Sequence, residues 1–308
     1  TIDQTSIPRS TVAEVYNTII SDVEKGINLL TEVNATGSKF RIGISTAHLL
    51  ASRYYLFMEN WEKVVEHATA VFSAPGNSYS LFDMTNVNYP NAINTGGFPH
   101  PFTLNNPEIL FFYASEEEHE VVTSDYYAKC FMASDQLRNC YSNEDQRWNG
   151  YLCPYGEAGD EKKSSKFARE LKFGACLRLS EAYLNRAEAY ANLAKIGGNE
   201  YFGKALSDLN TIREKRIKNY ASQAWTNSTF NNNADNLIEN CREERRREFC
   251  FEGMRWFDLR RYGMQSFSHR LDESTNPGDE HSVEIGTATP KWMLPIMQHH
   301  KESNPALN

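Results

Sequence analysis

The chain has 308 residues, 40% of them hydrophobic and 23% charged, and its formal net charge is −8. These values are typical of a globular protein with a substantial buried core. They argue against a nucleic-acid-binding surface, which needs clustered and uncompensated Lys and Arg, because the one basic run, Arg242 to Arg247, contains two glutamates. No apolar run approaches the roughly 20 residues that span a bilayer.

The first 73 residues contain apolar side chains at helical spacing. Residues from Thr11 to Leu30 predict a first helix, with Ser10 or Thr11 as its cap. A second helix is predicted from about Ser45, whose hydroxyl would cap it, to Met58, and a third from Trp61 to Phe72. Small residues at the expected contacts between the last two predict a helical hairpin.

A long stretch from Pro75 to Lys172 lacks sustained helical periodicity and is interrupted by prolines and glycines. One apolar run inside it, Ile109 to Tyr113, predicts a short strand. Such a stretch inside a compact domain usually carries function, so we expect it to present ligand. We therefore divide a single domain, residues 1–308, into a helical part (10–73), an irregular block (74–172), a second helical part (173–262) and an irregular tail (263–308).

A second helical hairpin is predicted after the irregular block. Its helices span Leu177 to Leu193 and Tyr201 to Arg216, and their small and apolar residues recur at spacings similar to those of the first hairpin. The repetition resembles a degenerate tetratricopeptide pattern. Each hairpin alone would expose an apolar face, so we expect the hairpins to stack. The predicted fold is therefore mainly α, with stacked tetratricopeptide-like hairpins, a long loop-rich region and few short strands.

The cysteines give no metal or redox motif, because no CxxC pair occurs among Cys130, Cys140, Cys153, Cys176, Cys241 and Cys250. We expect Cys176, Cys241 and Cys250, which fall in helical patterns, to be buried. A bridge between Cys140 and Cys153 stays open, since both lie in a loop-like stretch.

Two further motifs resemble sites but lack necessary features. Residues from Gly198 to Ala205 match most of a phosphate-binding loop, yet Ala205 stands where a Ser or Thr must hold magnesium. Oxygen ligands for a hard cation occur, without a binding-loop signature, at Asp272, Glu273, Asp279 and Glu280. We therefore predict no catalytic residue, no metal site and no cofactor.

The segment from Arg242 to Gly263 reads REERRREFCFEGMRWFDLRRYG. It predicts two helices, with Gly253 relaxing the backbone between them. Residues expected to form a broad apolar face are Phe249, Met254, Trp256, Phe257 and Leu259. Charged residues expected to pair at three- and four-residue spacing are Glu248, Glu252, Arg255, Asp258 and Arg260.

This segment closely resembles the C-terminal signature of the SusD/RagB family. The matching positions are Glu244, Arg245, Glu248, Glu252, Gly253, Arg255, Trp256, Asp258, Leu259, Arg261 and Gly263. Other stretches that look like the family are 41–57 with 61–71, 106–112, 177–191 with 209–216, and 291–308, where Met297 replaces a frequent second proline. The resemblance covers essentially all of the chain, but only about the last two thirds of a usual member.

The resemblance implies a nutrient-binding protein, not an enzyme, anchored by lipid to the extracellular face of the bacterial outer membrane. Such a protein hands oligosaccharides, or in the alternative peptides, to a TonB-dependent outer-membrane transporter of the SusC type, on which its helical face would pack. The chain starts at Thr1 without a signal-peptide pattern. We therefore expect the lipid anchor and a first helical portion, which often contributes to the family's binding site, to lie outside it.

Aromatic residues of the irregular block are our candidate ligand contacts: Tyr126, Tyr127, Trp148, Tyr151 and Tyr155. Their flat rings offer apolar faces on which the C–H faces of sugars can stack. Polar neighbours able to supply directional hydrogen bonds are Asn143, Asp145, Arg147 and Asn149, although we expect Asp145 and Arg147 to pair with each other. For any single ring, anchoring of the block to the helices is the favoured alternative.

Two other classes of function stay open. A tetratricopeptide-type scaffold would bind only protein partners and would have an exposed helical groove. A glycosidase would need two carboxylates facing each other across a cleft, and no such pair stands out among the 40 acidic residues.

Overall fold

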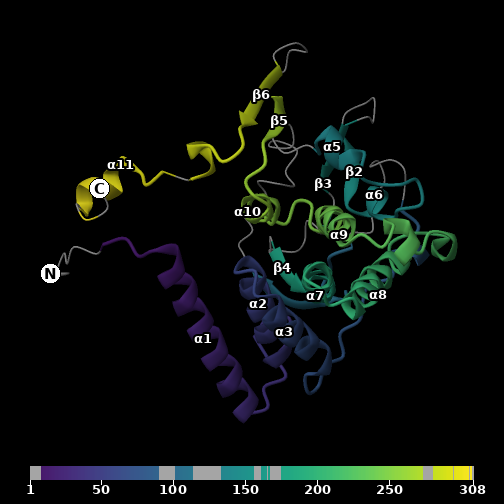
Figure 1. Cartoon of the computed structure of the whole chain (residues 1–308), viewed down its shortest axis with the longest axis horizontal. Coiled ribbons are helices and arrows are strands. Elements are labelled where there is room, and N and C mark those ends of the chain that lie inside the picture. The colour runs from purple at the N-terminus through teal and green to yellow at the C-terminus, as the bar shows by residue number, and fades with distance from the viewer. Residues whose placement is uncertain are drawn as a thin grey trace.

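Helices form most of the described structure (Figure 1). The computed structural model describes residues 8–89, 101–113, 133–155, 161–164, 166, 175–272, 280–293, 295–304 and 306. Its α-helices are α1 (Val12–Glu32), α2 (Ile44–Phe57), α3 (Trp61–Ser73), α5 (Asp135–Arg138), α6 (Arg147–Gly150), α7 (Leu179–Lys195), α8 (Glu200–Glu214), α9 (Ala234–Glu248), α10 (Arg255–Arg261) and α11 (Gln298–Ser303). Among these described helices, none combines the length and the apolar character needed to cross a membrane.

The first predicted helix is confirmed as α1. Thr11 caps it, because its hydroxyl oxygen accepts a hydrogen bond from the Glu14 backbone N–H at 3.2 Å and the Glu14 carboxylate accepts one from the Thr11 N–H at 2.7 Å. Ile27 in the C-terminal half is buried against α2, whereas Val12 and Val15 near the start are exposed. The N-terminal end of α1 accordingly leans away from the other helices (Figure 1).

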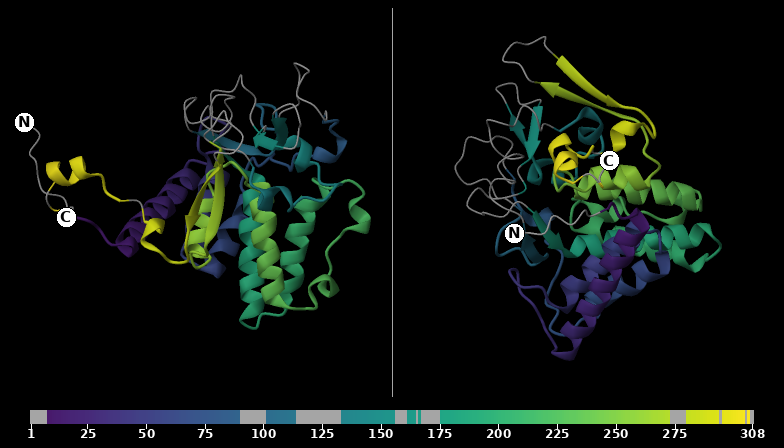
Figure 2. Two further views of the ribbon diagram at one scale, coloured as in Figure 1. Left: turned by 90° about the horizontal axis from the view of Figure 1, so that it is seen from above. Right: turned by 90° about the vertical axis from the view of Figure 1, so that its left-hand side faces the viewer.

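The two predicted hairpins are confirmed as α2–α3 and α7–α8, and they stack because α3 packs against α7. Fully buried alanines at these contacts allow close approach of the helices; they include Ala51, Ala68, Ala187, Ala191 and Ala205. Helix α9 also packs against α7, which extends the layer of helices (Figure 2). The fold is mainly α and tetratricopeptide-like, as predicted.

Two local predictions are wrong at the starts of these helices. Ser45 does not cap α2, since Gly43 occupies the capping position and Ser45 is buried inside the first turn. Cys176 and Leu177 belong to strand β4 (Ala175–Arg178) and not to a helix, because this segment pairs antiparallel with β1. Strand β1 (Ile109–Tyr113) has the predicted bounds.

Within the described residues, strands pair only in twos. Besides β1 with β4, β2 (Leu152–Tyr155) pairs with β3 (Glu161–Ser164) and β5 (Phe267–Asp272) with β6 (Glu280–Ile285), all antiparallel. The prediction of an irregular tail over residues 263–308 is wrong in this respect, since the tail contains the β5–β6 hairpin and α11. This hairpin projects beyond the helices (Figures 1 and 2), and Phe267 at its base contacts Trp292 edge-on, with 5.5 Å between ring centroids.

The cysteines are thiols wherever the structure describes their side chains. Cys140 is free, so the bridge to Cys153 is not formed, and its Sγ lies 3.0 Å from the backbone oxygen of Gln136. Cys176, Cys241 and Cys250 are free and buried, as predicted. Cys130 lies outside the described residues.

Candidate ligand-binding site

Buried charges join the irregular block to the helices. We call this cluster the charged core; its members, with side chains at most 5% exposed, are Glu108, Asp145, Arg147, Lys166, Arg178, Arg216, Glu244, Glu248 and Glu252. The first four come from the irregular block, and the others come from the end of β4, the segment that follows α8, and α9 with the turn after it. Because these segments are far apart in the sequence, the charged core fixes the position of the block on the helices.

Glu248 lies at the centre of the charged core. Its carboxylate accepts hydrogen bonds from Arg147 at 3.0 Å, from Arg216 at 2.9 Å, from the Tyr151 hydroxyl at 2.9 Å, and from Arg178. Burial by itself would raise the pKa of Glu248, but the three guanidinium groups outweigh burial and hold the pKa well below its usual value. Glu248 is therefore ionised and fully partnered.

Glu244, one turn earlier on α9, is held in the same way. It accepts hydrogen bonds from Arg147 at 2.7 Å and from Arg247 at 2.9 Å. Burial would raise the pKa of Glu244, but Arg147, Arg247 and Arg213 together lower it to about 2. Both glutamates thus face inward.

The predicted pairing at three- and four-residue spacing is wrong for Glu248 and Glu252, which pair with distant segments, whereas Asp258 does pair at this spacing, with Arg261. Residues 241, 244, 245 and 248 share one face of α9, and that face is buried. Glu248 is occupied by guanidinium groups of distant segments, and Glu244 by Arg147 of the irregular block together with Arg247 of its own helix, because only charged partners can compensate their burial. They are therefore not available to neutralise arginines on the outer face of α9.

Of the five candidate ligand residues, the structure describes the side chains of two, Tyr151 and Trp148. Tyr151 is 1% exposed, and Lys166 Nζ lies 4.1 Å from its ring centroid, so its ring anchors the block. Trp148 is partly exposed and packs against Tyr141, with 6.2 Å between ring centroids. Tyr126, Tyr127 and the side chain of Tyr155 lie outside the described residues.

Of the four polar neighbours of these rings, two are buried and two are at least partly exposed. Asp145 and Arg147 pair as predicted, with Arg147 Nη2 2.7 Å from Asp145 Oδ2, and both are buried. Asn143 is exposed and Asn149 partly exposed. The acidic cation ligands considered in the sequence lie outside the described side chains, and the described residues contain no group of three or more His, Cys, Asp or Glu arranged to hold a metal ion.

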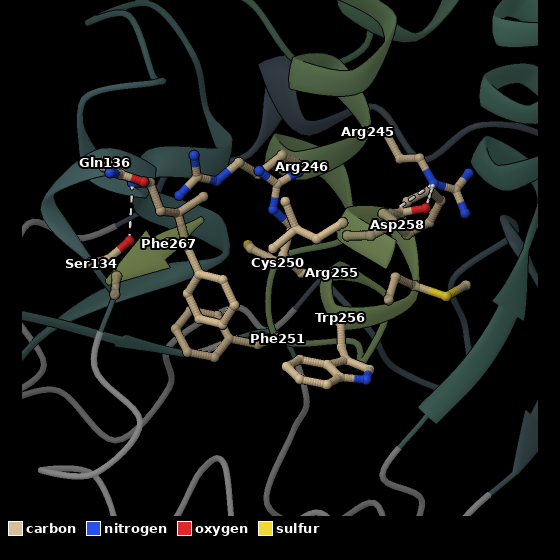
Figure 3. Close-up of a pocket in the computed structure, with 15 residues that line it drawn as sticks. Ser134, Gln136, Arg245, Arg246, Cys250, Phe251, Arg255, Trp256, Asp258 and Phe267 are labelled. Atoms are coloured by element: carbon tan, nitrogen blue, oxygen red, sulfur yellow. Dashed lines mark hydrogen bonds and ion pairs between the residues drawn. The ribbon is translucent and has the colours of Figure 1, made fainter. Parts of the chain in front are cut away.

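A cavity of about 290 Å³ lies where the irregular block meets α9 and α10 (Figure 3). Residues 133–137 of the block form one wall, the end of α9 and the following turn a second, α10 a third, and Phe267 of β5 closes it. Its volume is close to the lower end of the range of ligand pockets. The cavity is therefore the candidate site.

Three aromatic rings lie along one side of this cavity: those of Phe251, Trp256 and Phe267 (Figure 3). The Trp256 ring packs against the fully buried ring of Trp292, with 4.9 Å between ring centroids. Phe251 lies in the turn between α9 and α10 with a φ of 61°, a left-handed conformation that strains a bulky residue. Such strain is typical of residues held in place for a function, and here it directs an aromatic ring to the cavity.

The opposite side of the cavity is cationic. Arg245, Arg246 and Arg255 line it together with one carboxylate, Asp258. Arg245 Nε lies 3.0 Å from both Asp258 oxygens, and Arg261 also pairs with Asp258 at 3.0 Å. Among the residues that the structure describes, neither Arg246 nor Arg255 has an ion pair or a hydrogen bond from its guanidinium group.

A second, more open hollow of about 630 Å³ lies between α1, α2 and the turn that contains Phe251. Its two charged side chains are already partnered: Arg53 with Glu181 and Glu252 with Arg178. The hollow thus offers mainly apolar surface and no unpaired charge from the described residues. We regard the smaller cavity as the better candidate because it combines aromatic rings with guanidinium groups that have no partner among the described residues.

The residues of this cavity were not among those chosen from the sequence. Phe251, Trp256, Arg246 and Arg255 belong to the segment from Arg242 to Gly263, for which the sequence predicted only two helices with an apolar face and paired charges. A signal was present: Cys241, Glu244, Arg245 and Glu248 occupy the spacing of a buried helix face, which turns Arg246 outward. Phe267 carried no local signal, because its position depends on the pairing of β5 with β6.

Comparison with known proteins agrees with this architecture. The sequence model of a family described as the SusD family matches residues 85–308. No curated protein matches the sequence.

Solved structures resemble the chain over its whole length. A SusD-like carbohydrate-binding protein from Bacteroides vulgatus is 19% identical with a TM-score of 0.68, and a SusD superfamily protein from Bacteroides thetaiotaomicron is 23% identical with a TM-score of 0.69. The chain is covered completely in both comparisons and spans 68% of each relative. A SusD-like carbohydrate-binding protein from Bacteroides fragilis is 14% identical, with a TM-score of 0.65, and 74% of it is covered. At these identities the likeness concerns the fold.

Proposed function

The chain belongs to the SusD family, and from this premise we propose that it binds oligosaccharides without transforming them. The observation that carries the proposal is the cavity at the junction of the irregular block with α9 and α10. Its lining includes the rings of Phe251, Trp256 and Phe267 and two arginines, Arg246 and Arg255, that have no ion-pair partner among the described residues. Two similar structures are described as SusD-like carbohydrate-binding proteins, which supports the same class of ligand.

The two sides of the cavity suit the two kinds of surface that a sugar ring presents. Its C–H faces stack on aromatic rings, and Phe251, Trp256 and Phe267 offer such rings. Its hydroxyl groups accept hydrogen bonds from guanidinium groups and exchange them with polar side chains such as Gln136. Trp148, Tyr126, Tyr127 and Tyr155 would extend the contact along the irregular block.

Binding without turnover fits the charges of the cavity. Hydrolysis of a glycosidic bond uses two carboxyl groups on either side of the bond. Among the described lining residues, Asp258 is the one carboxylate, and Arg245 and Arg261 occupy it. We therefore assign no catalytic residue.

We further propose that the protein acts at the extracellular face of the outer membrane, held by a lipid anchor, and delivers its ligand to a SusC-like, TonB-dependent transporter. Family membership supports this assignment. The stacked helices α2, α3, α7 and α8 would provide the face that packs on the transporter. Peptides are the alternative cargo, and an exclusively protein-binding scaffold is the alternative function.

A binding screen tests the proposal. The chain is applied to arrays of oligosaccharides and of peptides, and hits are measured by titration calorimetry. We expect oligosaccharides to bind. The substitution Phe251→Gly should lower their affinity about tenfold, because it removes one stacked ring. Glycine relieves the positive φ of residue 251, so this variant should stay folded.

Phe257→Ala is the matched control for this variant. Phe257 is a 52% exposed ring of the same segment that does not line the cavity. The Phe257→Ala substitution should therefore leave the affinity for the oligosaccharide unchanged. Binding of peptides alone would favour the alternative cargo, and binding of neither would favour the scaffold.

A further inference from the structure

We propose that the cavity selects acidic oligosaccharides, with Arg246 and Arg255 binding a carboxylate or sulfate group on the sugar. This inference rests on the proposed function and specifies its class of ligand. Arg246 and Arg255 both line the cavity, and their guanidinium groups lie close together on the side opposite the aromatic rings (Figure 3).

The excess positive charge follows from the way in which α9 is packed. The helix turns Glu244 and Glu248 into the charged core, where Arg147, Arg178 and Arg216 occupy them. Arg246 points away from that face and reaches the cavity. The lining thus contains three guanidinium groups and one carboxylate, that of Asp258, which is paired with Arg245 and Arg261.

Arg255 approaches Arg246 from α10, and neither forms an ion pair with a carboxylate of the described residues. Partial burial lowers the pKa of Arg255, and repulsion from Arg246 lowers it further, although Tyr262, Asp258 and Cys140 act in the opposite direction. Two cations held together in a partly buried site are costly unless an anion lies between them. Guanidinium groups bind carboxylate and sulfate through paired, charge-assisted hydrogen bonds.

The remaining features favour a small acidic sugar as the source of the anion. A volume of about 290 Å³ admits a short ligand, and the rings of Phe251, Trp256 and Phe267 suit an apolar sugar face beside the charged group. A long polyanion is disfavoured because the chain as a whole carries a net charge of −8.

The test uses acidic oligosaccharides with neutral counterparts of the same shape. Uronate-bearing, sialate-bearing and sulfated oligosaccharides are titrated into the chain beside the methyl esters of the first two and the desulfated form of the third. We expect at least one acid to bind about 10- to 100-fold more tightly than its counterpart, and the preference to shrink as salt is added. The uronate and sulfate arms distinguish the two anions.

Variants locate the effect. Arg246→Gln and Arg255→Gln should each remove most of the preference for the acid, measured as the ratio of the affinities for the acid and for its neutral counterpart. Arg260→Gln, an exposed arginine of α10 outside the cavity, should change neither. Circular dichroism checks that the variants fold.

Two results would overturn the inference. If neutral sugars bind as tightly as their acids, or if both variants keep the preference, acid selection fails while oligosaccharide binding stands. If no sugar of either kind binds, the proposed function fails with it.

Discussion

At the scale of single residues, Glu248 shows how this protein accommodates buried charge. Three guanidinium groups and one hydroxyl donate to its carboxylate in a site that is closed to solvent. A buried ion is costly unless it is fully paired, so removing its charge leaves three buried cations undercompensated. The stability of the charged core therefore depends on this one residue.

We expect Glu248→Gln to lower the free energy of unfolding by about 3–5 kcal/mol, measured by urea denaturation. Glu243→Gln is the control on the same helix, because the side chain of Glu243 is 59% exposed and lies 3.6 Å from Arg247. The control should change stability by less than about 0.5 kcal/mol. Equal effects of the two substitutions would show that the charged core does not hold the fold together.

Among the elements, α1 is attached to the α2–α3 hairpin by a small polar cluster. His48 Nδ1 of α2 lies 3.0 Å from His67 Nδ1 of α3, and His67 Nε2 lies 3.1 Å from Glu24 Oε1 of α1. The Tyr55 hydroxyl donates to the same Glu24 oxygen at 2.8 Å. Burial lowers the pKa of His48, and repulsion from His67 lowers it further, although Glu24 and Glu66 act in the opposite direction.

This cluster predicts that the protein loses stability as the pH falls from about 7.5 to 5.5. The unfolded chain takes up a proton at His48 near pH 6.5, whereas the folded state resists it, so acid favours unfolding. His48→Asn should flatten this part of the curve of unfolding free energy against pH. His299→Asn, an exposed histidine of α11, should leave the curve unchanged. A curve that His48→Asn does not alter would contradict the assignment.

Elements that depend on local patterns were predictable from the sequence, and those that depend on distant partners were not. Helix α1 has its cap and apolar spacing within its own residues, and the predicted bounds differ by two residues or fewer at each end. The β5–β6 hairpin was missed because its pairing joins segments that show no periodicity of their own. The cavity was missed because Glu244 and Glu248, the acidic neighbours of Arg246 in the sequence, pair elsewhere, so that Arg246 has no ion pair within the described part of the chain.

At the scale of the whole molecule, a rigid stack of helices supports an irregular block, and the charged core holds the two together. The candidate cavity lies at their junction and takes residues from both. This arrangement suits a protein that captures a ligand on loops while its helices stay available to a partner. The chain spans 68% of the length of two structures that share its fold.

The central claim is that the protein holds oligosaccharides and does not cleave them. The most direct test incubates a ligand identified in the array with stoichiometric protein for a day at neutral pH and recovers it for mass spectrometry. We predict that the ligand is bound, as shown by calorimetry, and is recovered at its original length. Shortened products at a rate that depends on the protein concentration would contradict the account.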